Sequence, residues 1–97
     1  MKLNRHANLI NRCGVLYLQD YDSIVASYNV KYAYFKLGKD WNYSSTTLKT
    51  IYNFIFEFVE VPEIREVNSR TKKKEYLEKL INNKIILVDN LKEELYN

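Results

Sequence analysis

The chain has 97 residues, of which 46% are hydrophobic, 14% aromatic and 28% charged, and its formal net charge is +3. This length and apolar content are typical of one folded domain, and they exclude a disordered or low-complexity chain. Two glycines and one proline exclude collagen-like and linker-rich proteins, so we expect a single compact domain over residues 1–97.

The first half of the chain predicts a three-stranded antiparallel β-meander. Residues 1–13 are expected to form an irregular or short helical lead-in. An apolar run, Val15–Leu18, is followed by the turn-forming residues Asp20–Ser23. Ile24–Tyr28 and Tyr32–Leu37 are two further runs rich in strand-forming residues. The three residues between these runs have the length of a hairpin loop.

The segment Trp41–Thr47, with the sequence WNYSSTT, predicts the start of a helix, and a ligand site is the less favoured alternative. Ser44 or Ser45 can cap the first turn, because a serine hydroxyl accepts a hydrogen bond from an unpaired backbone N–H there. Trp41 and Tyr43 precede the cap and are expected to pack back against the helix. The apolar residues that follow recur at the spacing of three and four that marks one helical stripe. They are Leu48, Ile51, Tyr52, Ile55 and Val59, with Phe54, Phe56 and Phe58 beside them.

The next segment predicts an extended connection and a second helix. Pro62 prevents the first helix from continuing, so 61–68 is expected to be extended. Asn68 or Ser69 can cap the second helix, and Asn83 can end it in a left-handed conformation. The apolar positions of this helix are Tyr76, Leu77, Leu80 and Ile81.

The last segment predicts a compact strand at Ile85–Val88, and Asp89 or Asn90 can cap a final helical turn. The expected fold class is therefore α+β. A small antiparallel meander packs against two main helices, and a short strand and a final helical turn complete the chain.

Two stretches of the sequence resemble a family of small uncharacterised phage and mobile-element proteins. Leu18–Ala26 has the order Leu-Gln-x-Tyr-Asp-Ser-Ile-Val-Ala, and Trp41–Thr47 has the order Trp-Asn-Tyr-Ser-x-Thr-Thr. The likeness covers roughly residues 15–88. The family carries a His on the turn after Thr-Thr, where this chain has Thr50, so any function of that His is absent here.

This resemblance implies a setting and no assigned activity. The setting is a virus or plasmid of a low-GC bacterium, where small phage proteins often act by binding a host protein. Some such proteins inhibit bacterial defence systems such as CRISPR effectors. The resemblance therefore implies a viral or mobile-element inhibitor that binds a host or phage protein.

The sequence argues against catalysis. A nucleophile needs a base within hydrogen-bond reach, and the only histidine and the only cysteine, His6 and Cys13, lie in the polar lead-in. Gly14 and Gly38 stand alone, so neither belongs to a phosphate-binding glycine loop. We expect no enzymatic activity, no cofactor and no metal site.

The sequence also predicts a protein of the host cytoplasm. A single cysteine cannot form an intrachain disulfide, which fits a reducing compartment. No apolar run approaches the roughly 18 residues that cross a bilayer. Residues 1–11 are polar and lack the apolar stretch of a secretory signal.

The first functional hypothesis is a protein-binding surface built on tyrosines, because rigid aromatic side chains anchor many protein interfaces. The alternative is that these tyrosines pack beneath the helices. The predicted surface is a sheet face that exposes either Tyr32 and Tyr34 or Tyr21 and Tyr28, with a basic run at its rim formed by Arg70, Lys72, Lys73 and Lys74.

The second hypothesis is that the same basic run contacts the phosphates of nucleic acid. Lysine contacts of this kind are non-specific and weaken as salt rises. An acidic block precedes the run, and the two blocks either offset each other within the fold or one of them is held for a partner. The acidic block consists of Glu57, Glu60, Glu63 and Glu66. A structural role in a virion or its assembly is the third alternative.

Overall fold

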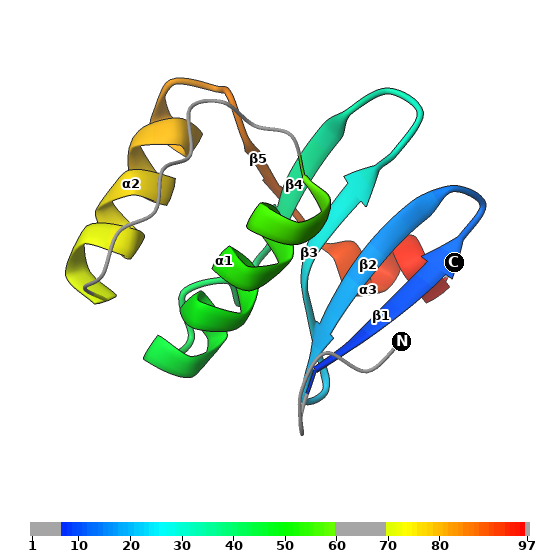
Figure 1. The fold of residues 1–97 in the computed structure, drawn as a ribbon, viewed down its shortest axis with the longest axis horizontal. Coiled ribbons are helices and arrows are strands. Elements are labelled where there is room, and N and C mark those ends of the chain that lie inside the picture. Colours follow the sequence, from blue (N-terminus) through cyan, green and yellow to red (C-terminus); the bar gives the residue numbers. More distant parts are fainter. Residues whose placement is uncertain (1–6, 60–69, 97) are drawn as a thin grey trace.

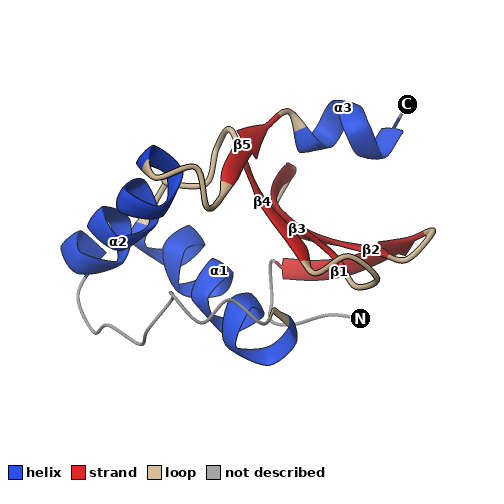
Figure 2. Cartoon of the chain, turned by 90° about the horizontal axis from the view of Figure 1, so that it is seen from above, coloured by secondary structure: helices blue, strands red, loops and turns tan. Residues whose placement is uncertain are grey.

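The fold is a five-stranded sheet with helices on both faces, as seen in the computed structural model, which describes residues 7–59 and 70–96 (Figures 1 and 2). The strands are β1 (Ala7–Arg12), β2 (Val15–Asp20), β3 (Ser23–Asn29), β4 (Tyr34–Gly38) and β5 (Leu87–Asp89). The helices are α1 (Ser45–Phe58), α2 (Arg70–Asn82) and α3 (Leu91–Tyr96). Strands β1 to β4 form an antiparallel meander, and β5 pairs in parallel with β4. The α+β prediction is confirmed.

The meander has four strands, so the predicted lead-in is wrong over Ala7–Arg12. This segment pairs with β2 along its whole length, with Leu9 opposite Leu18, and Ala7 is fully buried. The turn to β2 consists of Cys13 and Gly14, whose φ angles are 53° and 83°. Two positive φ angles at the centre of a two-residue hairpin fit the right-handed twist of the strands. Pairing with β2 across this two-residue turn makes this polar segment a strand.

The β3–β4 hairpin is longer than the sequence predicts. β3 ends at Asn29 and β4 begins at Tyr34, so the predicted strand start at Tyr32 lies in the loop. The backbone N–H of Tyr32 donates to Asn29 Oδ1 at 3.1 Å, which holds the loop as a side-chain-stabilised turn. The Val30 N–H donates to the Gly14 carbonyl at 3.2 Å and ties this loop to the neighbouring hairpin.

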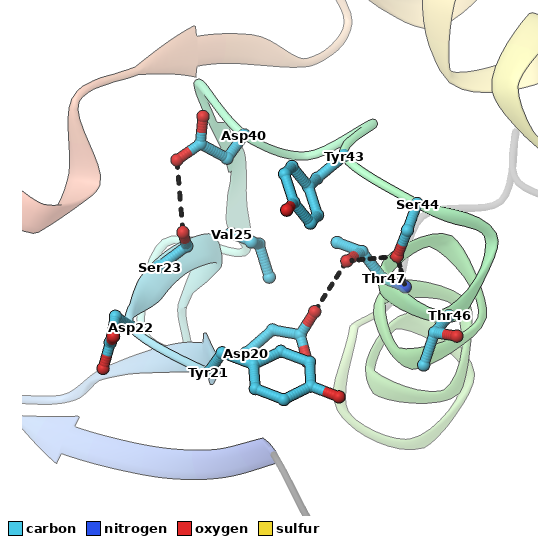
Figure 3. A pocket seen from close by; sticks show the side chains of 10 residues that line it. All are labelled: Asp20, Tyr21, Asp22, Ser23, Val25, Asp40, Tyr43, Ser44, Thr46 and Thr47. Carbon is cyan, nitrogen blue, oxygen red and sulfur yellow. Dashed lines mark hydrogen bonds between the residues drawn. The ribbon is translucent and has the colours of Figure 1, made fainter.

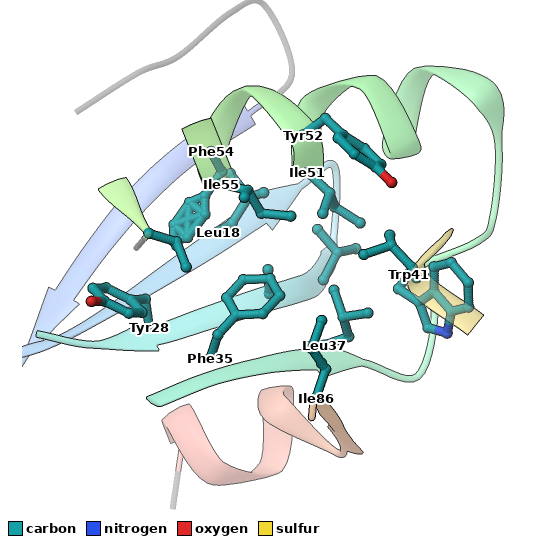
Figure 4. Close-up of a cluster of buried hydrophobic side chains, with 14 of the residues drawn as sticks. Leu18, Tyr28, Phe35, Leu37, Trp41, Ile51, Tyr52, Phe54, Ile55 and Ile86 are labelled. Atoms are coloured by element: carbon teal, nitrogen blue, oxygen red, sulfur yellow. The ribbon is translucent and has the colours of Figure 1, made fainter. Parts of the chain in front are cut away.

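The main core lies between the sheet and α1 (Figure 4). Helix α2 packs against α1. The predicted stripe of α1 is buried in full, and Phe54 is buried with it. Phe56 is 51% exposed and Phe58 is half-buried, so the buried face of α1 is narrower than the sequence predicts. Trp41 packs into this core as predicted.

The start of α1 confirms one of the two predicted caps. The Thr47 N–H donates to Ser44 Oγ at 3.1 Å, so Ser44 is the N-cap and Ser45 is the first helical residue. Tyr43 is 79% exposed, and the prediction that it packs against the helix is wrong. Trp41, two residues before Tyr43, is the aromatic residue of this segment that is buried in the core.

The end of α2 differs from the sequence prediction by one residue. The positive φ of 60° falls on Lys84, because the N–H groups of Lys84 and Ile85 bond back to the Ile81 and Leu80 carbonyls. Asn83 is therefore not the left-handed residue. The predicted extended connection 61–68 and the predicted caps Asn68 and Ser69 lie outside the described residues.

The C-terminal elements lie at the edge and on the second face of the sheet. β5 is shorter than the predicted strand and begins two residues later, while Ile86 is buried in the main core. The Glu93 N–H donates to Asn90 Oδ1 at 3.2 Å, so Asn90 caps α3 as predicted. None of the helices in residues 7–59 and 70–96 is long and apolar enough to cross a membrane.

Helix α3 covers the sheet face opposite α1 and closes a second, smaller core (Figure 2). This core consists of Tyr17, Ile24, Leu91 and Leu95. Polar contacts reinforce it, because the Tyr17 hydroxyl donates to Glu94 Oε2 at 2.9 Å and Lys36 forms an ion pair with the same carboxylate.

Candidate functional site

An open cleft of about 530 Å³ lies where the β2–β3 turn faces the start of α1 (Figure 3). We call it the tyrosine–aspartate cleft. Its lining residues come from the β2–β3 hairpin, the β4–α1 loop and the first turn of α1. They are Asp20, Tyr21, Asp22, Ser23, Val25, Asp40, Tyr43, Ser44, Thr46 and Thr47.

A β-bulge shapes the sheet side of the cleft. Leu18 pairs with Ala26 and Gln19 pairs with Ile24, so Val25 is an extra residue between two paired ones. Ile24 consequently faces the second, smaller core beneath α3, while Val25 belongs to the main core and also lines the cleft. The bulge thus changes which face each side chain of β3 occupies near the turn.

One wall of the cleft is held by a chain of hydrogen bonds between β2 and α1. The Thr47 hydroxyl donates to Asp20 Oδ2 at 2.7 Å, and Ser44 Oγ lies 3.0 Å from the same hydroxyl oxygen. Since Thr47 uses its proton on Asp20, the Ser44 hydroxyl is the donor to Thr47. Asp20 is only 3% exposed, and a buried carboxylate requires such partners. Asp20 therefore serves the fold at this wall.

The opposite wall depends on the close approach of β4 to β3. A Cβ atom on Gly38 would lie 2.0 Å from the Ile24 carbonyl oxygen, so only glycine fits there. This approach brings Asp40 to Ser23, whose hydroxyl donates to Asp40 Oδ2 at 3.2 Å. The Tyr43 N–H donates to the Asp40 carbonyl at 3.1 Å and closes the next turn. The Asp40 carboxylate is thereby held at the cleft.

Two tyrosines border the cleft and expose most of their surface. Tyr21 is 66% exposed and Tyr43 is 79% exposed. Tyr21 has a φ of 54°, which for an aromatic residue costs on the order of 1 kcal/mol or more. The β2–β3 turn therefore holds an exposed aromatic ring in a backbone conformation that its residue type disfavours.

The cleft is locally negative in a chain whose net charge is +3. Its lining includes three aspartates and no Lys, Arg or His. A smaller pocket of about 270 Å³ shares Asp22, Ser23 and Asp40 and is lined on its other side by Lys39 and Lys92. Within the described ranges, no group of three or more His, Cys, Asp and Glu side chains is arranged to hold a metal ion.

The structure places the four predicted tyrosines in three different environments. Tyr21 lines the cleft, whereas Tyr32 and Tyr34, which are 71% and 44% exposed, lie at the other end of the β3–β4 hairpin. Tyr28 is 6% exposed in the main core, so its prediction as an exposed anchor is wrong. It lies opposite Phe35 on β4, and both side chains point to the α1 face.

Three residues of the cleft, namely Tyr43, Asp22 and Asp40, are not among the binding residues that the sequence predicts, although Tyr43 lies in the segment whose less favoured alternative is a ligand site. The sequence could have placed Asp22 and Asp40 in turns, because short acidic side chains are common there. Nothing local shows that the two turns meet.

The predicted basic run lies on the first turns of α2 and does not line the cleft. Lys72 and Lys74 are exposed, and Lys74 lies 3.8 Å from Glu78. Lys73 lies over the Tyr52 ring at 5.5 Å, and the Tyr52 hydroxyl donates to the Lys73 carbonyl at 2.9 Å. Lys73 thus contributes to α1–α2 packing.

Part of the predicted charge pattern lies outside the described residues. This part comprises Glu60, Glu63 and Glu66, so the offset between the two charge blocks stays a prediction. Arg70 begins α2.

Comparison of the chain with known proteins gives no match to a protein-family model, a curated protein or a solved structure. The tyrosine–aspartate cleft combines concave shape, exposed aromatic rings and fixed carboxylates in one place. What the protein does is therefore inferred from the chemistry of this cleft.

Proposed function

We propose that this protein is a non-enzymatic binding module that holds another protein at the tyrosine–aspartate cleft. The observation that carries the proposal is the pair of exposed rings, Tyr21 and Tyr43, at a concave site. Tyrosine is enriched in protein interfaces, since it offers a large apolar surface with a polar tip and few rotatable bonds.

The construction of the cleft supports this proposal, because a preorganised surface loses little conformational entropy on binding. The Asp20–Thr47–Ser44 hydrogen bonds hold one wall. The approach permitted by Gly38 and the Ser23–Asp40 bond hold the other wall. Both exposed rings thus extend from segments whose positions are fixed by these contacts.

The resemblance to small phage and mobile-element proteins supports a host protein in the bacterial cytoplasm as the partner. Components of defence systems such as CRISPR effectors are the first partners to test. Binding and blocking such a component requires an interface and no catalytic group.

A nucleic-acid partner is less well supported. The aspartates of the cleft repel phosphates, and the described lysines of α2 include one that stacks on Tyr52 and one that faces Glu78. If the basic run did contact phosphates, binding would fall steeply with salt.

The proposal is tested by site-specific photo-crosslinking in bacterial cells. A photoreactive phenylalanine analogue replaces Tyr43 in one variant and Tyr96 in the control, because Tyr96 is also 62% exposed but lies outside the cleft. We expect one defined protein to crosslink at position 43 and not at position 96, with nuclease treatment having no effect. Equal crosslinking at both positions, or recovery that nuclease abolishes, would contradict the proposal.

The partner is then used in a direct binding measurement. Tyr43→Ser and Tyr21→Ser are each expected to weaken its affinity about tenfold or more, as truncation of an interface anchor does. Tyr32→Ser, at the other end of the sheet, is expected to leave the affinity unchanged. An effect confined to Tyr32→Ser would assign binding to the β3–β4 loop instead.

A further inference from the structure

We infer that β5 forms a second protein-binding surface, at which an extended segment of another protein adds to the edge of the five-stranded sheet. The segment that fits has aliphatic residues at its centre and acidic residues at its ends. This surface is separate from the tyrosine–aspartate cleft and adds a binding activity to the proposed function. Three observations support it: the open edge of β5, its exposed aliphatic side chains and the lysines around it.

The outer side of β5 is an open sheet edge in the described part of the chain. β5 is the last strand of the sheet, with α2 and α3 to either side of it, and it pairs with β4 alone (Figure 2). No other described segment forms a backbone hydrogen bond with Leu87–Asp89. A strand carries N–H and C=O groups on both of its sides, so the side away from β4 can pair with a further strand. Such main-chain pairing requires an extended partner.

The side chains around β5 are aliphatic although they are exposed. Ile85, Leu87 and Val88 are 44%, 47% and 40% exposed. Strands in parallel pairing are usually covered on both faces, and edge strands are commonly protected by a lysine, a proline or a bulge. The sequence of β5 is Leu-Val-Asp, and its register with β4 has no bulge. An added strand would remove these aliphatic side chains from water, which is favourable.

The edge is held in place before a partner binds. Ile86, next to β5, is 1% exposed in the main core, and its N–H and that of Ile85 donate to the Leu80 carbonyl. At the other end, Lys36 Nζ on β4 lies 3.9 Å from Asp89 Oδ2. β5 therefore loses little conformational entropy when a strand is added.

The charges at the ends of β5 favour an acidic partner. Lys84 precedes the strand, and Lys39 and Lys92 follow β4 and β5 and line one small pocket. All three lysines are exposed, and none forms an ion pair with another described residue. Asp22 and Asp40 also line that pocket and partly offset its lysines, so Lys84 is the main contact for an acidic group.

A second copy of this chain fits the edge less well. Lys84 and Lys92 each lie four residues from Val88. Antiparallel pairing of two β5 strands about Val88 would therefore bring Lys84 of one copy towards Lys92 of the other. Like charges placed opposite each other destabilise a strand pair. Charge complementarity thus favours an acidic segment of another protein.

The first test uses the peptide acetyl-Glu-Glu-Val-Ile-Val-Glu-Glu-amide as the probe. It is titrated into the full-length protein up to its solubility limit, and backbone amide chemical shifts are followed by NMR. The matched peptide has Lys in place of each Glu. We expect the acidic peptide to shift the amides within 84–90 and the lysine peptide to bind about tenfold more weakly or less, because it meets like charges at the edge.

N-methylated forms of the acidic peptide test the main-chain contact. A strand presents alternate N–H groups to its two sides, so methylation of the two valine nitrogens blocks one side and leaves the other. Methylation of the isoleucine nitrogen as well blocks both sides, while every side chain is retained. We expect the first form to bind and the second form not to bind.

Variants of the protein locate the contact. Val88→Asp is expected to weaken binding of the acidic peptide about tenfold or more, and Val30→Asp is the control, because Val30 is 57% exposed in the β3–β4 loop. Lys84→Gln is expected to weaken binding about threefold, as loss of one exposed ion pair does. Lys49→Gln, at an exposed position of α1, should have no effect. Circular dichroism checks that each variant is folded.

Any of four results would overturn the inference. They are no shift within 84–90 at any peptide concentration, equal binding of the acidic and lysine peptides, equal binding of the two N-methylated forms, and equal affinities of the variants and their controls. Sedimentation that showed a dimer of the unmodified protein and a monomer of Val88→Asp would also overturn it, since a second copy would then occupy the edge. Crosslinking at Tyr43 tests the proposed function independently, because Tyr43 lines the cleft.

Discussion

Gly38 shows how one residue fixes the geometry of the cleft. A Cβ atom at this position would meet the Ile24 carbonyl oxygen at 2.0 Å and the Val25 Cα at 3.1 Å, and both are backbone atoms that cannot rotate away. Gly14 differs, because it has a φ of 83° but nothing within 4 Å of its added Cβ. Gly38 is required because a Cβ atom has no room there, and Gly14 is favoured because its backbone is left-handed.

Gly38→Ala is therefore expected to lower the free energy of unfolding by about 3 kcal/mol, the upper part of the usual range for overpacking. Gly14→Ala is the matched control and is expected to cost about 1 kcal/mol, the cost of a left-handed conformation for a residue with a Cβ. Urea unfolding of both variants measures the difference. Equal losses would mean that β3 and β4 separate readily at the cleft.

Trp41 and Tyr43 have opposite roles although only one residue separates them. Trp41 is 6% exposed in the core, so Trp41→Ala is expected to cost roughly 3–5 kcal/mol of unfolding free energy. Tyr43 is 79% exposed, and Tyr43→Ala is expected to stay within about 0.5 kcal/mol of the unmodified protein. Thermal unfolding measures both. A folded, stable Trp41→Ala protein that had lost partner binding would make Trp41 part of the interface.

At the scale of elements, the start of α1 joins helix stability to the shape of the cleft. Ser44 caps the helix and also donates to Thr47, which in turn binds Asp20 on β2. The same side chains therefore begin the helix and fix one wall. Helix α3 is attached in a comparable way, since Glu94 binds both Tyr17 and Lys36 while Leu91 and Leu95 are buried.

The cap is expected to be a property of Ser44 alone. Ser44→Ala should lower the unfolding free energy by about 1 kcal/mol, because the Thr47 N–H loses its acceptor. Ser45→Ala should have almost no effect, since Ser45 is an exposed residue inside the first turn. Chemical unfolding of the two single variants decides between them. Equal effects would show that the two serines share the cap.

At the scale of the whole molecule, one tyrosine in each of the two cores resists ionisation, namely Tyr17 on β2 and Tyr52 on α1. Burial raises the pKa of Tyr17 to about 12, and the hydrogen bond to Glu94 adds to this rise. Burial also raises the pKa of Tyr52 to about 12. In the unfolded chain both groups titrate near the ordinary value of about 10. The folded protein thus holds protons that the unfolded chain releases.

The contribution of these two tyrosines to the unfolding free energy is therefore expected to be constant below about pH 10. It is expected to fall as the pH rises from about 10 to about 12. A shift of two pKa units corresponds to roughly 3 kcal/mol for each group. Urea unfolding between pH 9 and 11 measures the slope, and Tyr17→Phe and Tyr52→Phe should each reduce it. Absorbance at 295 nm that showed all nine tyrosines titrating together near pH 10 would contradict this.

The sequence by itself determined the features that depend on neighbours three or four residues away. The buried stripe from Leu48 to Val59, a serine cap before it and the Asn90 cap of α3 all follow from helical periodicity and local hydrogen bonding. The α+β class follows from the order of these patterns.

Tertiary structure decided the features that depend on strand pairing and on the packing of the sheet. Ala7–Arg12 becomes a strand because β2 provides its partner, and the bulge at Val25 sets which face each residue of β3 occupies. Tyr28 is buried because its position on β3, opposite Phe35, faces the main core. The cleft joins two turns and a helix start, and no local rule relates Asp22 to Asp40. Register and packing place them together, because both are set by contacts across the sheet.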